Sequence, residues 1–139
     1  MSPAIMVRNG RPVAAYGSPG GATIINSVLN ITLNLVDHGM SIQQAIDAPR
    51  LSVTSALGTL SCETGQPFMQ PAFSDATLAQ LKALGHFSNS TTLALACSTT
   101  TIGSVQGVIV DLQTGKQYGG ADQRREGTVI GLPRPGGKK

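Results

Sequence analysis

The stretch Gly17-Ser18-Pro19-Gly20-Gly21 decides how the chain around it folds, because it joins an extended hairpin to an apolar helix through a turn that only small residues make. The first N–H groups of a helix have no partner inside the helix, and the aligned peptide dipoles place partial positive charge there. A carboxylate, a phosphate or a developing oxyanion is therefore favoured at this turn. The same residues also fit a plain strand-to-helix connection, so the motif alone leaves both interpretations open.

Two short extended runs precede the turn, at residues 3–7 and 12–16, and Arg8-Asn9-Gly10-Arg11 separates them. The pair Asn-Gly is a strong hairpin signal because both residues tolerate positive φ. We therefore expect a β-hairpin whose second strand leads directly into the glycine turn.

A helical pattern follows the turn over residues 22–38, with a wide apolar face and Gly39 placed to end it. Asn26, Asn30 and Asn34 recur every four residues and form a polar stripe on this helix. The stripe, and a length below the roughly 20 residues that a membrane span needs, indicate a helix packed in a soluble protein.

The rest of the chain alternates short extended runs with helices. Ser41 and Gln44 fit a capping box for a second helix that Pro49 ends, and Ser74 is placed to cap a third helix that ends at Gly85. Extended runs are expected at residues 50–54, 59–63, 91–97 and 103–112 and near Tyr118. This order predicts an α+β fold with antiparallel-rich sheets flanked by helices, in one domain over residues 1–131 with a flexible basic tail over 132–139.

The charge distribution argues against nucleic-acid binding. The net charge is +3, but residues 1–131 carry seven Lys/Arg and seven Asp/Glu, so the whole excess comes from Arg134, Lys138 and Lys139 in the tail. A basic face interleaved with aromatic residues is absent from the sequence pattern. Any nucleic-acid contact is therefore expected only from the tail.

The two cysteines, Cys62 and Cys97, lie 35 positions apart without a Cys-x-x-Cys motif or clustered histidines, so we expect no metal site. We interpret them as two buried free thiols, with a disulfide as the alternative if the protein is exported. His38 follows the last apolar turn of the first helix and His86 follows Leu84-Gly85, and we expect both to have structural roles.

An ordered set of motifs covers most of the chain: Met1-Ser2-Pro3, the Asn9-Gly10 hairpin, Gly17 to Gly21, Asp37-His38-Gly39-Met40, Ala45-Ile46-Asp47-Ala48-Pro49-Arg50, Leu84-Gly85-His86 and Gly119 to Arg124. In this order and at these separations, the set resembles the C-terminal part of the small subunit of γ-glutamyltransferases. The resemblance extends from Met1 to about Gly131.

The resemblance implies a partial αββα sandwich of the N-terminal-nucleophile hydrolase type. It implies an enzyme that cleaves γ-glutamyl amides such as glutathione with a threonine nucleophile and passes the γ-glutamyl group to water, an amino acid or a peptide. The implied partners are the remainder of the small subunit, the large subunit and the γ-glutamyl substrate, without a cofactor, in the periplasm or outside the cell.

The resemblance also assigns the candidate site residues. Gly20 and Gly21 match paired glycines whose N–H groups form the oxyanion hole, where a Cβ would obstruct the close approach of the developing anion. Ser18 is expected to orient the turn and take part in substrate binding. The nucleophilic threonine would lie upstream of the Met-Ser-Pro segment, and Thr99-Thr100-Thr101 do not replace it, because an interior threonine lacks the free α-amine that serves as base.

Two further expectations concern charged residues and the alternative function. Asp47 and Arg50 are expected to form a local ion pair around Pro49, and Asp122 and Arg124 an ion pair that fixes the last strand. The alternative to the catalytic interpretation is a non-catalytic domain that uses the same glycine turn to bind an anion or a γ-glutamyl group.

Overall fold

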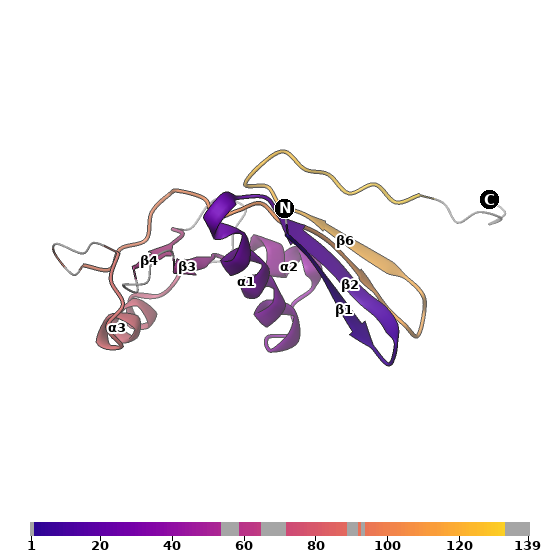
Figure 1. The fold of residues 1–139 in the computed structure, drawn as a ribbon, viewed down its shortest axis with the longest axis horizontal. Helices are drawn as coiled ribbons and strands as arrows, with labels where there is room; N and C mark the ends of the chain where they lie inside the picture. Colours follow the sequence, from indigo (N-terminus) through magenta and orange to yellow (C-terminus); the bar gives the residue numbers. More distant parts are fainter. Residues whose placement is uncertain (1, 54–58, 65–71, 89–91, 93, 133–139) are drawn as a thin grey trace.

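A four-stranded antiparallel sheet leads into the glycine turn in the computed structural model, which describes residues 2–53, 59–64, 72–88, 92 and 94–132. The sheet has the order β1-β2-β5-β6, with bounds Ser2–Arg8, Arg11–Ser18, Gln106–Val110 and Gln117–Ala121. Helices α1 (Ile24–Val36) and α2 (Ile42–Asp47) pack on one face of it (Figure 1). The predicted α+β fold with antiparallel sheets is confirmed.

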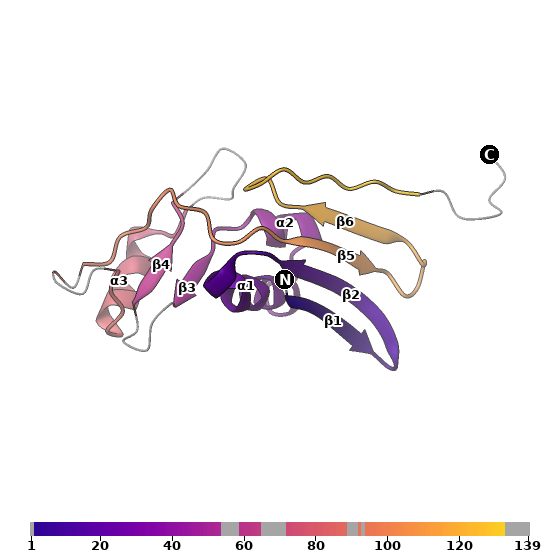
Figure 2. The ribbon, with the colours of Figure 1, turned by 45° about the horizontal axis from the view of Figure 1, so that its top comes forward.

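A smaller unit lies beside the end of the sheet where β2 stops and β5 begins (Figure 2). It consists of the antiparallel pair β3 (Leu51–Val53) and β4 (Leu60–Cys62), together with helix α3 (Asp75–Ala83). The predicted Ser74 cap of α3 is confirmed, because the Ser74 hydroxyl accepts a hydrogen bond from the Thr77 N–H. Residues 65–71, before this helix, and residues 133–139 of the predicted tail over 132–139 lie outside the described residues.

The hairpin and the second helix form as predicted. Asn9 and Gly10 have φ values of 51° and 74°, the left-handed conformation that lets a two-residue turn match the twist of its strands. At the start of α2, the Ser41 hydroxyl accepts from the Gln44 N–H and the Gln44 side chain accepts from the Ser41 N–H. This capping box is the one predicted from the sequence.

The first helix is shorter than predicted. A short 3-10 turn, η1 (Gly21–Thr23), precedes α1, so the regular helix covers residues 24–36 instead of 22–38. The reason lies in Gly20 and Gly21, whose φ values of 142° and 59° are not helical. At the other end, the N–H groups of Asp37 and His38 both reach the Leu33 carbonyl, and Gly39 with φ 62° turns the chain away.

The hydrophobic core lies between the sheet and the two helices. Its buried members are Ala14, Tyr16, Ile31, Ile42, Ala45, Ile46 and Val105. Gly107 and Gly120 allow α2 to approach the sheet closely, since a Cβ on Gly120 would lie 2.7 Å from the Cδ1 atom of Ile46. Burial of each large aliphatic side chain contributes about 1.5–3 kcal/mol.

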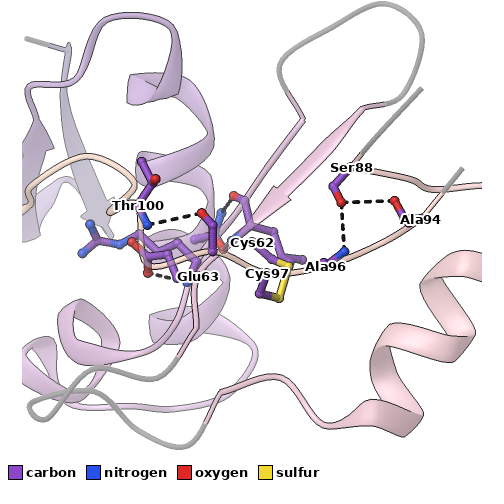
Figure 3. The surroundings of a disulfide bond; sticks show 11 residues. Cys62, Glu63, Ser88, Ala94, Ala96, Cys97 and Thr100 are labelled. Carbon is purple, nitrogen blue, oxygen red and sulfur yellow. Dashed lines mark hydrogen bonds between the residues drawn. A yellow bond between two sulfur atoms is a disulfide. The ribbon is translucent and has the colours of Figure 1, made fainter. Parts of the chain in front are cut away.

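The predicted strand over residues 91–97 is wrong for the part that the structure describes, while 91 and 93 lie outside it. Residues 94–98 run beside β4 through one parallel bridge between Glu63 and Ser98 instead of a ladder. The Ser88 side chain holds this segment, because its hydroxyl donates to the Ala94 carbonyl and accepts from the Ala96 N–H (Figure 3). These side-chain contacts add to isolated backbone hydrogen bonds, such as the one from the Ser88 N–H to the Ala94 carbonyl, and the described residues form no continuous ladder here.

Cys62 and Cys97 form a disulfide, so the prediction of two free thiols is wrong (Figure 3). The parallel bridge between Glu63 and Ser98 brings the two cysteines together, since Cys62 directly precedes Glu63 and Cys97 directly precedes Ser98. A separation of 35 residues carries no information about this pairing, which depends on how β4 lies beside the later segment.

The asparagine stripe of α1 holds the smaller unit against the main helix. The Asn30 side chain donates to the Leu51 carbonyl at 3.0 Å and accepts from the Leu51 N–H at 3.2 Å, as a neighbouring strand would. Asn26 makes the equivalent pair of contacts with Val53, and Asn34 donates to the Ala45 carbonyl of α2.

None of the helices in the described part of the chain has the length and hydropathy needed to span a bilayer.

We expect Asn30→Ala to lower the free energy of unfolding by about 1–2 kcal/mol, because it leaves the part-buried N–H and carbonyl of Leu51 without partners. Asn26→Ala is the matched control, since its contacts with Val53 are exposed to water and the loss is expected to stay below about 0.5 kcal/mol. Urea unfolding followed by circular dichroism measures both. Equal losses would contradict the strand-like role of Asn30.

Candidate functional site

The glycine turn presents two adjacent N–H groups at the mouth of the first helix. Gly21 is exposed and Gly20 half-buried, and within the described part of the chain neither N–H donates a hydrogen bond. The Gly20 carbonyl, in contrast, accepts from both the N–H and the hydroxyl of Thr23, which closes the turn. The two amides therefore remain outside the sheet ladder and available to a ligand.

Small residues hold the turn against the chain segment before β5. A Cβ on Gly20 would lie 2.7 Å from the Thr23 hydroxyl and 3.1 Å from the Gly103 Cα. A Cβ on Gly103, whose φ is 69°, would lie 2.7 Å from the Ser18 hydroxyl oxygen and closer still to that of Ser27, so it would collide with both. The turn can thus adopt its conformation only with glycine at these places.

Ser18 is fully buried at the end of β2, and its hydroxyl makes two hydrogen bonds. It donates to the Pro19 carbonyl at 2.6 Å and accepts from the Ser104 N–H at 3.0 Å. The side chain therefore fixes the direction in which the chain leaves the strand and ties the turn to the segment before β5.

The electrostatic environment of the turn favours an anion. The aligned dipoles of η1 and α1 place partial positive charge at their N-terminal end, and the first turn of α1 holds no acidic residue. Among the described residues, no group of three or more His, Cys, Asp or Glu is arranged to hold a metal ion. The groups that the turn itself offers to a ligand are the backbone N–H donors of Gly20 and Gly21.

A buried cluster of four charged side chains contacts the backbone just before β5: Arg50, Glu63, Asp122 and Arg124. Arg50 pairs with Asp122 at 2.7 Å, and both side chains are fully buried. Arg124 forms a two-pronged pair with Glu63, at 2.8 Å from Nε to Oε1 and 2.6 Å from Nη2 to Oε2. The two positive and two negative charges compensate one another, which burial of ions requires.

The cluster holds the backbone on both sides of Gly103 and Ser104. Glu63 accepts from the Ile102 N–H at 2.6 Å, while Arg50 donates to the Ile102 carbonyl at 2.8 Å. Asp122 accepts from the Val105 N–H at 2.7 Å. The segment that packs against the glycine turn is therefore fixed at both ends by buried charge-assisted hydrogen bonds.

The surroundings of Asp122 set its protonation. Burial alone would raise the pKa of this carboxyl, but the Arg50 guanidinium and the N–H groups of Val105 and Arg124 hold the pKa below its ordinary value. For Arg50, burial and the neighbouring Arg124 lower the pKa of the guanidinium from its ordinary value. The carboxylate of Asp122 is thus the ionised partner that keeps Arg50 compensated.

A family model described as gamma-glutamyltranspeptidase matches residues 1–132. The chain belongs to this family. It is 34% identical over 132 residues to a glutathione hydrolase proenzyme of Bacillus subtilis (strain 168), a match that covers 95% of this chain and 20% of the relative. The glutathione hydrolase proenzyme of Escherichia coli (strain K12) is 35% identical over 124 residues, covering 89% of this chain and 19% of the relative. The chain thus spans about a fifth of the length of these curated relatives.

Solved structures of the gamma-glutamyltranspeptidase family have the same fold. A mutant of the Helicobacter pylori gamma-glutamyltranspeptidase superposes with a TM-score of 0.73 at 27% identity, over 90% of this chain and 61% of that one. The family resemblance inferred from the ordered motifs is therefore confirmed by sequence and by structure.

The structure brings some of the predicted residues together and separates others. The ion pair between Asp122 and Arg124 is confirmed at 3.1 Å. The predicted pair between Asp47 and Arg50 is wrong, because Arg50 turns to Asp122 while Asp47 accepts from Gln43. Burial raises the pKa of Asp47. His38 is exposed after α1, and His86 is half-buried after α3 with its N–H on the Leu81 carbonyl.

Sequence reasoning missed three residues that shape the site: Glu63, Gly103 and Ser104. Glu63 ends an extended run without any motif of its own, so no local signal pointed to it. Gly103-Ser104 is a small pair at the start of the predicted extended run 103–112, and a glycine in a strand pattern indicates a close backbone approach.

We expect Asp122→Asn to lower the free energy of unfolding by about 3–5 kcal/mol, because it leaves the buried Arg50 charge without compensation. Asp37→Asn, at an exposed position after α1, is the matched control and is expected to change stability by less than about 0.5 kcal/mol. Denaturant unfolding measures both. A loss at Asp122 as small as the control's would contradict the structural role of the cluster.

Stability should also depend on pH through Asp122. The folded pKa of this carboxyl lies below its unfolded value, so its ionisation stabilises the folded protein above that unfolded value, about 3.9, and the contribution is lost as the pH falls further toward the folded pKa. We expect the unfolding free energy of the wild type to fall more steeply below about pH 4 than that of Asp122→Asn. Urea titrations at a series of pH values measure the slopes, and identical slopes would contradict the assignment.

Proposed function

We propose that this chain is a segment of an enzyme that cleaves γ-glutamyl amides such as glutathione and transfers the γ-glutamyl group to water, an amino acid or a peptide. In this proposal the segment supplies the oxyanion hole through the N–H groups of Gly20 and Gly21. The observation that carries the proposal is the pair of adjacent, unpaired amides at the N-terminal end of η1 and α1. Membership of the gamma-glutamyltranspeptidase family supports it.

The chemistry follows from where negative charge develops. Attack on the γ-glutamyl carbonyl turns its oxygen into an oxyanion, and two preorganised donors at about 3 Å stabilise that charge without rearranging during the reaction. Each such donor contributes on the order of 3 kcal/mol to transition-state stabilisation. The nucleophilic threonine implied by the family resemblance comes from another part of the enzyme, since an interior threonine such as Thr99 lacks the α-amine base.

Ser18 takes part in substrate binding in this proposal by orienting the turn. Its hydroxyl is engaged with the Pro19 carbonyl and the Ser104 N–H, so it holds the peptide groups that follow it in a fixed direction. Fixed donors stabilise an anion better than mobile ones because no ordering is needed when the charge appears.

The face of β1 that is turned away from the helices supports the proposed αββα arrangement and its partners. Ala4 and Met6 face the helices, so the alternation along β1 places Ile5 and Val7 on the opposite face, where they are 68% and 61% exposed. Two sheets pack through such apolar faces about 10 Å apart. We propose that a second sheet from the rest of the enzyme, small or large subunit, covers this face.

In the complete enzyme that carries this chain, we expect Gly21→Ala to lower kcat by about two orders of magnitude, because a Cβ at this place obstructs the anion and disturbs a donor. Gly39→Ala is the matched control: its φ of 62° equals the 59° of Gly21 within a few degrees, and a Cβ meets no atom within 4 Å at either position. The backbone strain of about 1 kcal/mol is therefore common to both.

Release of an aromatic amine from a γ-glutamyl anilide measures this pair of variants. Equal losses at Gly21 and Gly39 would show that the effect is strain alone and would contradict the oxyanion role. If the complete wild-type protein binds γ-glutamyl compounds in calorimetry but does not turn them over, the result would favour the non-catalytic binding domain instead.

We expect the 139-residue chain by itself to release no amine from the same anilide above the rate of its Gly20→Val variant, because the proposed nucleophile lies outside it. The assay uses the purified chain with the anilide at a concentration that saturates the complete enzyme. Amine release clearly faster than that of Gly20→Val would contradict the proposal that the nucleophile comes from another part of the enzyme.

A further inference from the structure

The segment from Cys97 to Ser104 connects the disulfide to the glycine turn. Its first residue is bonded to Cys62 of β4, and its last donates its N–H to the Ser18 hydroxyl at 3.0 Å. Between them, Gly103 packs directly against Ser18, Ser27 and Gly20. A covalent path of eight residues, from Cys97 to Ser104, therefore runs from the disulfide to the turn.

Two backbone hydrogen bonds hold the upstream end of the segment beside β4. The Ser98 N–H donates to the Cys62 carbonyl and the Thr64 N–H donates to the Ser98 carbonyl, both at 2.8 Å, which is a single bridge and not a ladder. The next anchor, Ile102, is held by Glu63, the residue directly after Cys62. The hydrogen bond between Glu63 and Ile102 joins two distant segments of the chain. The disulfide links the same two segments covalently.

We infer that the Cys62–Cys97 disulfide and the segment 98–104 are positioning elements for the glycine turn, so that the thiol redox state of this pair controls the competence of the oxyanion site. This inference rests on the proposed function, since the turn has to bind an oxyanion for its position to affect turnover. Ser104 and Gly103 act through Ser18 and Gly20 and touch no substrate themselves.

The chemistry of the switch is a thiol–disulfide exchange. A dithiol attacks one sulfur of the pair, the Cys62–Cys97 bond breaks, and a second attack within the mixed disulfide releases two cysteine thiols while the dithiol becomes a cyclic disulfide. Two electrons and two protons pass to the protein. Cys62 is 2% exposed, but Cys97 is half-buried at the edge of the smaller unit, which gives a thiolate a sulfur to attack.

The first test measures turnover in the complete enzyme that carries this chain, oxidised and after incubation with dithiothreitol. We expect reduction to lower kcat by about tenfold and to change KM by less than about twofold, because a small displacement of donors acts on the transition state. The double variant Cys62→Ser/Cys97→Ser should have the lowered kcat from the start and respond no further to dithiothreitol. Equal kcat in the oxidised and reduced enzyme would overturn the inference.

A coupling measurement separates positioning from general loosening. Ser18→Ala removes the acceptor that joins the segment to the turn, so reduction of this variant is expected to lower kcat by much less than the tenfold seen in the wild type. A full tenfold drop in the variant would show that the disulfide does not act through Ser18, and this outcome would also overturn the inference.

Amide hydrogen exchange tests the inference without any reliance on catalysis. Reduction should increase exchange in peptides covering residues 98–104 and 17–21 and leave the hairpin tip at residues 8–11 unchanged. If exchange at 17–21 does not change, the inference fails even where the enzyme is active. If exchange changes while the oxidised protein lacks activity on γ-glutamyl anilides, the coupling stands and the proposed function fails.

Discussion

The structure depends on the mutual compensation of four charges that are withdrawn from water. Arg50, Glu63 and the pair Asp122 and Arg124 come from three places in the chain. Their hydrogen bonds join the end of α2, the ends of β4 and β6 and the backbone before β5. A buried charge without a partner costs several kcal/mol, so no single member of the cluster can be lost without penalty. The main sheet, the second helix and the smaller unit are thereby held in one arrangement.

The glycine turn takes its conformation from this arrangement more than from its own sequence. Pro19, Gly20 and Gly21 permit a turn that leaves two amides unpaired, but many conformations satisfy that requirement. Gly103 and Ser104 select one of them. Only a glycine at position 103 fits against the hydroxyl groups of Ser18 and Ser27, and the Ser104 N–H donates to the Ser18 hydroxyl. Residues about 80 positions away in the sequence therefore define the direction of the two donors.

Local signals in the sequence were sufficient for elements with local causes. The Asn9-Gly10 turn, the capping box at Ser41 and the Ser74 cap depend on residues within three positions of one another, and the structure has all three. The predicted start of α1 is too early because Ala22 and Thr23 fit the helical period, whereas in the structure they belong to the 3-10 turn that begins at Gly21. The order of motifs was enough to place the chain in its family.

Contacts between distant segments could not be predicted from single residues. Proximity in sequence predicts an ion pair between Arg50 and Asp47, whereas the partner in the structure, Asp122, lies 72 positions away. The same limit explains the free-thiol prediction for Cys62 and Cys97, whose pairing depends on one bridge between distant backbones. Glu63 carried no signal because its role is to join segments that only the fold brings together.

The asparagines of α1 have a consequence for the behaviour of the chain at high concentration. An unpaired strand edge attracts strands of other molecules and promotes aggregation. Asn26 and Asn30 occupy the outer N–H and carbonyl groups of β3, so this edge offers no template to a foreign strand. The side chains of α1 thus cover the edge of the two-stranded sheet against pairing with a strand of another molecule.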